Sequence, residues 1–170
     1  MAVTRALALT LVLALAVVLQ VSVFPYLSYT GVVPDLTLIV VVAAALVRGP
    51  EFAAVLGFFG GLALDLAPPA DHVAGRWALA LVVVGYLAGR VRHDARSSAL
   101  AAVITVAASS FVGTSIFALS GILLHDPDLP VAEALRVIPV SVLYDVLVTP
   151  FVLPLVLRMF RRLEPREVVY

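Results

Sequence analysis

The sequence predicts an all-α polytopic membrane protein, in which a single domain of 170 residues forms a bundle of six transmembrane helices. Composition is the first observation behind this prediction. Hydrophobic residues make up 63% of the chain, charged residues make up 13%, and the mean hydropathy is +1.14. An ordinary soluble domain is about half apolar and about a quarter charged. The other two observations are six apolar stretches separated by short loops, and an uneven distribution of arginine between those loops.

Six stretches of the chain are apolar enough to be transmembrane helices, each of which needs about 20 such residues to cross the hydrocarbon core. The second, third and fourth stretches are short, so we expect them to stand upright or to lie deep in the bundle. We place the six helices at residues 5–24, 34–47, 51–67, 77–90, 98–124 and 137–158.

The first two predicted helices have clear boundaries. The first ends at Pro25. A cleaved signal peptide is the alternative for residues 1–25, but the segment lacks a small-x-small cleavage site and its apolar run is long for a signal sequence. The second begins at Pro34 and Asp35, because proline in the first turn loses no hydrogen bond and an acid faces the positive end of the helix dipole. It ends before the sequence Arg48–Pro50.

The remaining helices are bounded by similar signals. Two prolines, Pro68 and Pro69, follow the third helix, and the fourth ends at Arg90. The fifth is the longest. Residues 126–130 predict a turn, and residues 131–136 predict a short interfacial helix that connects the fifth helix to the sixth.

The arginines predict the orientation, because cytoplasmic loops of membrane proteins carry an excess of Lys and Arg. If successive loops alternate between the two sides, nine arginines lie on one side: Arg5, Arg48, Arg90, Arg92, Arg96, Arg158, Arg161, Arg162 and Arg166. Only Arg76 and Arg136 lie on the other. Both termini are therefore expected in the cytoplasm. The outer side then carries the acids Asp35, Asp65, Asp71, Asp126, Asp128 and Glu133.

Small residues at four-residue spacing predict close helix packing. Gly57 and Gly61 lie in the third helix, and Gly85 and Gly89 in the fourth. Such spacing lets helix backbones approach closely, which matters in lipid because apolar burial gives no net attraction between helices. These sites either bind a partner helix or pack helices within the bundle, and the second use is the more common. The fifth helix has its own small and polar stripe of Thr105, Ser109, Gly113 and Ser120.

Asp145 is the one acid well inside a predicted span. An ionisable group within the membrane indicates a functional site by default, and the nearby Pro150 and Pro154 free backbone carbonyls that can line a polar cavity. The alternative is a structural acid whose hydrogen bonds hold the sixth helix to Tyr144 or to the polar stripe of the fifth helix. Both interpretations stand on the sequence alone.

No enzymatic site is predicted. Asp35 and Asp65 form a candidate carboxylate pair on the outer side, but a helix start explains Asp35, and Asp65 is expected at a helix end near water. The chain has no cysteine, and its three histidines all fall in predicted loops. Without a His, Cys or third carboxylate at suitable spacing, we expect no catalysis, bound metal or cofactor. The net charge of +0 also gives no indication of nucleic acid binding.

Several motifs along residues 33–92 occur in an order that resembles the MreD family of rod shape-determining proteins. They are a Pro-Asp-Leu at the start of the second helix, an Arg-Gly turn, a Gly-Phe-x-x-Gly-Leu-x-x-Asp helix and a Gly-Tyr-Leu-x-Gly-x-x-Arg ending. The matching residues are Pro34, Asp35, Leu36, Arg48, Gly49, Gly57, Phe58, Gly61, Leu62, Asp65, Gly85, Tyr86, Leu87, Gly89 and Arg92. The last helix is also similar, although many members are expected to carry an uncharged polar residue at Asp145.

The resemblance implies a non-enzymatic, multi-pass scaffold in the plasma membrane that belongs to the bacterial cell-elongation machinery. Its implied partner is an MreC-type single-span protein, through which it influences the RodA and penicillin-binding-protein synthase of peptidoglycan. A homodimer within the complex is also expected. The family's fold is similar to that of the S-components of energy-coupling-factor transporters, so a membrane subunit that binds a small ligand is the alternative function.

Overall fold

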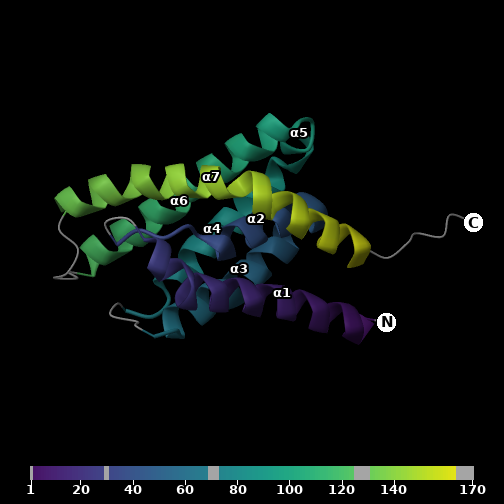
Figure 1. Cartoon of the computed structure of the whole chain (residues 1–170), viewed down its shortest axis with the longest axis horizontal. Coiled ribbons are helices and arrows are strands. Elements are labelled where there is room, and N and C mark those ends of the chain that lie inside the picture. Colours follow the sequence, from purple (N-terminus) through teal and green to yellow (C-terminus); the bar gives the residue numbers. More distant parts are fainter. Residues whose placement is uncertain (1, 29–30, 69–72, 125–130, 164–170) are drawn as a thin grey trace, which may run out of the picture.

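The computed structural model is an all-α bundle (Figure 1) and describes residues 2–28, 31–68, 73–124 and 131–163. Seven α-helices and one 3-10 helix make up these residues. In chain order they are α1 (Ala2–Ser22), η1 (Phe24–Leu27), α2 (Leu36–Arg48), α3 (Pro50–Leu66), α4 (Arg76–Arg90), α5 (Arg92–Ala95), α6 (Ala99–Leu123) and α7 (Val131–Leu163).

Helices occupy all six predicted segments, with two differences. The loop expected after Arg90 contains the short helix α5. The separate interfacial helix expected at residues 131–136 is wrong, because these residues form the first turns of α7, a continuous helix of 33 residues. Pro139, three residues after Arg136, is a helix-breaking signal, but it lies inside α7 and the helix continues through it. The turn predicted at residues 126–130 lies outside the described residues. Helix α6 ends at Leu123, within one residue of the predicted end.

Three helical stretches are long and apolar enough to cross a membrane: Leu7–Tyr26, Ala99–Leu123 and Leu135–Arg162. Helix α2 is apolar but shorter, with 13 residues. The outer faces of the long helices are also apolar, as exposed Leu11 and Leu15 on α1 and exposed Leu147 and Phe151 on α7 illustrate. Together with the composition, these features support a polytopic membrane protein.

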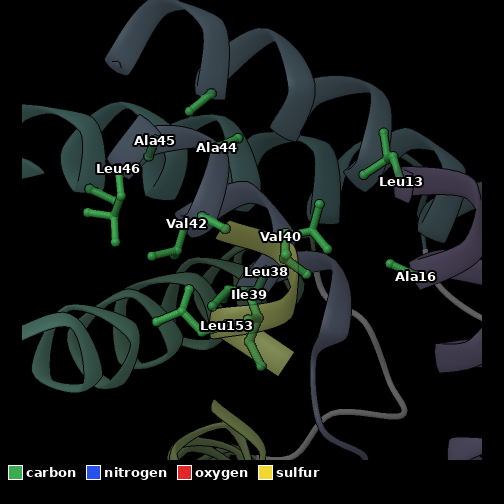
Figure 2. Close-up of a cluster of buried hydrophobic side chains, with 14 of the residues drawn as sticks. Leu13, Ala16, Leu38, Ile39, Val40, Val42, Ala44, Ala45, Leu46 and Leu153 are labelled. Carbon is green, nitrogen blue, oxygen red and sulfur yellow. The ribbon is translucent and has the colours of Figure 1, made fainter. Parts of the chain in front are cut away.

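Helix α2 forms the centre of the bundle. Every residue from Leu36 to Val47 is buried, and α2 contacts α1, α3, α4, α6 and α7. Figure 2 shows side chains of α2 in one buried cluster with Leu13 and Ala16 of α1 and Leu153 of α7. A helix that is hydrophobic on all sides is typical of a protein core or of a membrane span, and the sequence of α2 contains Thr37 as its only polar residue before Arg48.

Glycines bring α3 and α4 into close backbone contact. A Cβ atom on Gly57 would collide with the backbone of Leu81, and one on Gly61 would collide with the backbone at Trp77 and Ala78. In the same way, Gly85 and Gly89 of α4 lie against the backbone of Ala53 and of Pro50 in α3. All four glycines are buried. Their faces are therefore used for packing within the bundle, which was the second of the two alternatives.

Replacing Gly61 with leucine should destabilise the protein, because a side chain there must push α3 and α4 apart. We expect a loss of about 1–3 kcal/mol in the free energy of unfolding, the range typical of overpacking. The measurement is thermal unfolding of the purified protein in mild detergent, followed through the single tryptophan, Trp77. Ala63→Leu is the matched control, because Ala63 lies on the exposed face of the same helix. Equal midpoints for the two variants would contradict this packing role.

Candidate functional site

A cluster of polar side chains lies inside the bundle where α2 begins. The side chains come from α1, α2, α6 and α7 and from the residue before α2. All of them are buried: Gln20, Asp35, Thr37, Ser110, Asp145 and Thr149. Polar groups are costly to bury unless they are hydrogen-bonded, so the bonds within this cluster decide what it can do.

Asp145 connects α7 to two other helices. Its Oδ1 accepts a hydrogen bond from the backbone N–H of Asp35 at 2.6 Å, and its Oδ2 accepts one from the Ser110 hydroxyl of α6, also at 2.6 Å. The Thr149 hydroxyl donates to the backbone carbonyl of Asp145 at 2.5 Å. The structural interpretation of Asp145 therefore has a geometric basis, but its partners differ from those expected. Neither Tyr144 nor a member of the predicted stripe takes part, since Ser110 is the neighbour of Ser109 and projects from the next position around α6.

Two of the first N–H groups of α2, those of Thr37 and Leu38, have side-chain acceptors. Asp35 Oδ1 accepts from the N–H of Leu38 at 2.8 Å, which is the helix cap that the sequence predicted. Gln20 of α1 accepts through Oε1 from both the N–H and the hydroxyl of Thr37, at 2.9 and 2.8 Å. The second carboxylate oxygen of Asp35, Oδ2, is buried and has no hydrogen-bond partner among the described residues.

Asp65 forms a second buried cap. Its carboxylate accepts from the backbone N–H groups of Gly75 and Ala78 through Oδ2, at 2.8 and 3.1 Å, and of Trp77 through Oδ1 at 3.1 Å. These N–H groups belong to the start of α4, where orphan donors need acceptors. Only 2% of Asp65 is exposed, so the expectation that it lies near water is wrong. The reason is that α4 returns against α3, which brings the start of α4 to the end of α3.

Asp35 and Asp65 thus serve different helices. Asp35 caps α2 and Asp65 caps the start of α4, so their described hydrogen bonds give no paired catalytic arrangement. Among the described residues, no group of three or more His, Cys, Asp or Glu side chains is placed to hold a metal ion. Of the histidines, His93 lies in α5, while His72 and His125 lie outside the described residues.

A buried arginine joins α4 to α6. Arg76 is 3% exposed, and its Nη2 donates to the backbone carbonyl of Phe117 at 2.9 Å. Its guanidinium also lies over the Phe117 ring, with 4.0 Å between Cζ and the ring centroid. Trp77 stacks on the same ring at 4.5 Å, and Gly121 leaves room for the guanidinium. The sequence placed Arg76 on the outer side but gave no signal for this contact.

The other predicted residues have local or packing roles. Gly113 faces Leu38 and Val84, and Ser109 and Pro34 are buried. Tyr86 is exposed, and its hydroxyl accepts from Arg90 at 3.1 Å. Two members of the predicted stripe bond to their own helix: Thr105 donates to the carbonyl of Ala101, and Ser120 donates to that of Phe117. The outer acids Asp71, Asp126 and Asp128, the side chains of Arg5 and Glu133, and Arg166 lie outside the described residues.

Comparison of the chain with protein families, with curated proteins and with solved structures finds no match. Chemically, the site consists of two buried carboxylates and an amide side chain that accept hydrogen bonds from helix starts.

Replacing Asp145 with asparagine or with leucine tests the importance of its hydrogen bonds, because both side chains are close to aspartate in size and only asparagine can form these bonds. Asparagine keeps an acceptor for the Asp35 N–H and can still bond to the Ser110 hydroxyl, so in potassium chloride the unfolding midpoint of Asp145→Asn should stay close to that of the wild type. Leucine leaves two buried donors without an acceptor, each at a cost of about 1–3 kcal/mol.

The measurement is again thermal unfolding in mild detergent. Thr149→Val is the control, because it removes only a bond to a carbonyl of its own helix. Equal stability of the leucine and asparagine variants would show that these bonds do not hold α7 in place.

Proposed function

We propose that this chain is a six-span, non-enzymatic scaffold of the bacterial cell-elongation machinery, which holds an MreC-type single-span partner in the plasma membrane. The observation that carries the proposal is the ordered series of motifs in residues 33–92 that resembles the MreD family. Through that partner the protein influences the RodA and penicillin-binding-protein synthase.

The positions of the motif residues support a scaffold. Asp35 and Asp65 cap two helices, and the glycines of α3 and α4 set the contact between these helices. These residues stabilise the bundle, and their contacts lie within it. A protein whose motifs maintain its own shape is suited to presenting a rigid surface to another protein, because little ordering entropy is then lost on binding.

Six spans and cytoplasmic termini form part of the proposal. Helix α1 begins and α7 ends at the same end of the bundle (Figure 1), as an even number of crossings requires. The short helices α2, α3 and α4 contain 13, 17 and 15 residues. Their lengths of roughly 20–25 Å at 1.5 Å per residue fall below the roughly 30 Å of the hydrocarbon core. To cross the membrane they need their connecting segments to add length, and the longer α1, α6 and α7 to enclose them.

A partner helix has apolar surface to bind. The long helices expose large side chains on their outer faces: Leu7, Leu11, Leu15 and Val18 on α1, Ile104, Phe111 and Leu119 on α6, and Leu143, Leu147, Phe151 and Leu155 on α7. In lipid such faces gain little from burial itself, so a partner must add close packing and hydrogen bonds. A second copy of the chain, or contacts at the acidic outer loops, would add to the same assembly.

The orientation is tested with single cysteines, because the chain has none of its own. Val73→Cys, before α4, should react with a membrane-impermeant thiol reagent added to intact cells. Ser97→Cys, between α5 and α6, should react only after the membrane is opened. Both positions are exposed in the structure, so a lack of reaction reports sidedness. The reverse pattern would overturn the predicted orientation.

The function is tested by purifying the protein from native membranes in mild detergent and identifying what co-elutes. We expect a single-span protein with a large extracytoplasmic domain, and we expect cells depleted of the chain to lose rod shape. Another multi-span membrane protein purified in parallel controls for carry-over. A stoichiometric small molecule, with no single-span protein present, would instead favour the transporter-like alternative.

A further inference from the structure

Helix α2 begins inside the bundle rather than at its surface. With 13 residues it spans roughly 20 Å. The residue just before it, Asp35, bonds through its N–H to Asp145, which lies well inside the candidate span Leu135–Arg162. Residues 32–35, before α2, are not helical, and Val32, Pro34 and Asp35 are buried. Irregular backbone at this depth is tolerated where protein encloses it, and unwound carbonyls beside a helix start are a recurring setting for bound ions in membrane proteins.

The hydrogen bonds at this point leave one of the carboxyl oxygens unused. Of the four oxygens of Asp35 and Asp145, three accept from N–H or O–H groups at 2.6–2.8 Å. The 2.6 Å bond from Ser110 is short for a hydroxyl and a carboxyl oxygen. The fourth oxygen, Asp35 Oδ2, is the buried atom without a partner among the described residues.

Positive charge near these carboxylates is insufficient. The start of α2 contributes the equivalent of about half a charge, and the facing side chains Gln20, Thr37 and Ser110 are neutral. Helix α6 contains no charged residue. The arginine of α2, Arg48, lies at the opposite end of the helix, and the described arginines of α7 are exposed. With both acids ionised, about one and a half negative charges would lack compensation in a setting of low dielectric constant, so the pair requires a bound cation or a proton.

We propose that Asp35 and Asp145 bind one sodium ion between them. Asp35 Oδ2 is its first ligand, and the Asp145 carboxylate, the Ser110 hydroxyl and backbone carbonyls of the non-helical stretch before α2 provide further oxygens. Hard oxygen ligands suit such a cation. Two carboxylates without a third acid or a histidine favour a single positive charge over a divalent ion. Protein interiors are close-packed in general, which favours Na⁺ over the larger K⁺. The ion links the start of α2 to α6 and α7 and does not depend on any protein partner.

Sodium should therefore stabilise the full-length protein in mild detergent. At constant ionic strength, replacing choline chloride with sodium chloride should raise the unfolding midpoint by about 5–10 °C once Na⁺ exceeds its dissociation constant by about 100-fold. Potassium chloride should have a much smaller effect. Asp145→Asn and Asp35→Asn keep the hydrogen bonds of the cluster and should lose the sodium shift. Asp94→Asn, an exposed acid on α5, should keep it.

Equilibrium binding of radioactive sodium to the wild type gives a direct count, expected to be one ion per chain and displaced by unlabelled Na⁺ but not by K⁺. This measurement decides the matter if the Asn variants cannot be purified. The proposal is overturned if no saturable sodium binding is found, or if Asp145→Asn keeps the shift. It is equally overturned if the midpoint follows pH and not sodium, since a proton would then occupy the site, or if choline, potassium and sodium act alike.

Discussion

The start of α2 imposes the main constraint on this fold. A helix that is buried on every side and too short to cross a bilayer must begin inside the protein, and its first N–H groups cannot reach water. Side chains from two other helices therefore meet it there: Gln20 of α1 binds Thr37, and Asp145 of α7 binds the N–H of Asp35. Asp145 in turn holds Ser110 of α6. The central helix, the first helix and the last two helices are positioned by this one set of bonds.

The α3–α4 pair solves a related problem in a different way. Apolar burial does not drive helix association in lipid, so close packing and hydrogen bonds must do so. Glycines let the two backbones touch along their length, and Asp65 at the end of α3 caps the start of α4. Arg76 then connects α4 to α6 through Phe117. The α3–α4 pair is thus joined to α6 through a buried polar contact. This contact and the Asp65 cap give hydrogen-bond partners to polar groups that would otherwise be buried without one.

These contacts bear on function because many of the motif residues in the sequence take part in them. The motif residues that resemble the MreD family lie mainly at helix caps and helix contacts, so what remains for another protein is the apolar exterior and the loops. A scaffold needs such a division, in which the interior maintains the shape and the exterior binds. The carboxyl groups of Asp35 and Asp145 are the exception, because one of their buried oxygens has no partner among the described residues and the charge of an ionised pair would exceed what the helix start can offset.

The sequence by itself determined the six main helices, the cap at Asp35 and the close packing at the glycines, while only the structure showed that these glycines pack within the bundle. Apolar run length, proline positions and four-residue spacing act within a few turns of a helix, so they can be recognised without knowing the fold. Only the tertiary structure decided that Asp65 is buried, that residues 131–136 continue into α7, and that Gln20 and Arg76 join separate helices. It also decided that Asp145 binds Ser110 and a backbone amide 110 residues away. Such partners depend on which helices become neighbours and on which side of each faces the other, and no local pattern records that geometry.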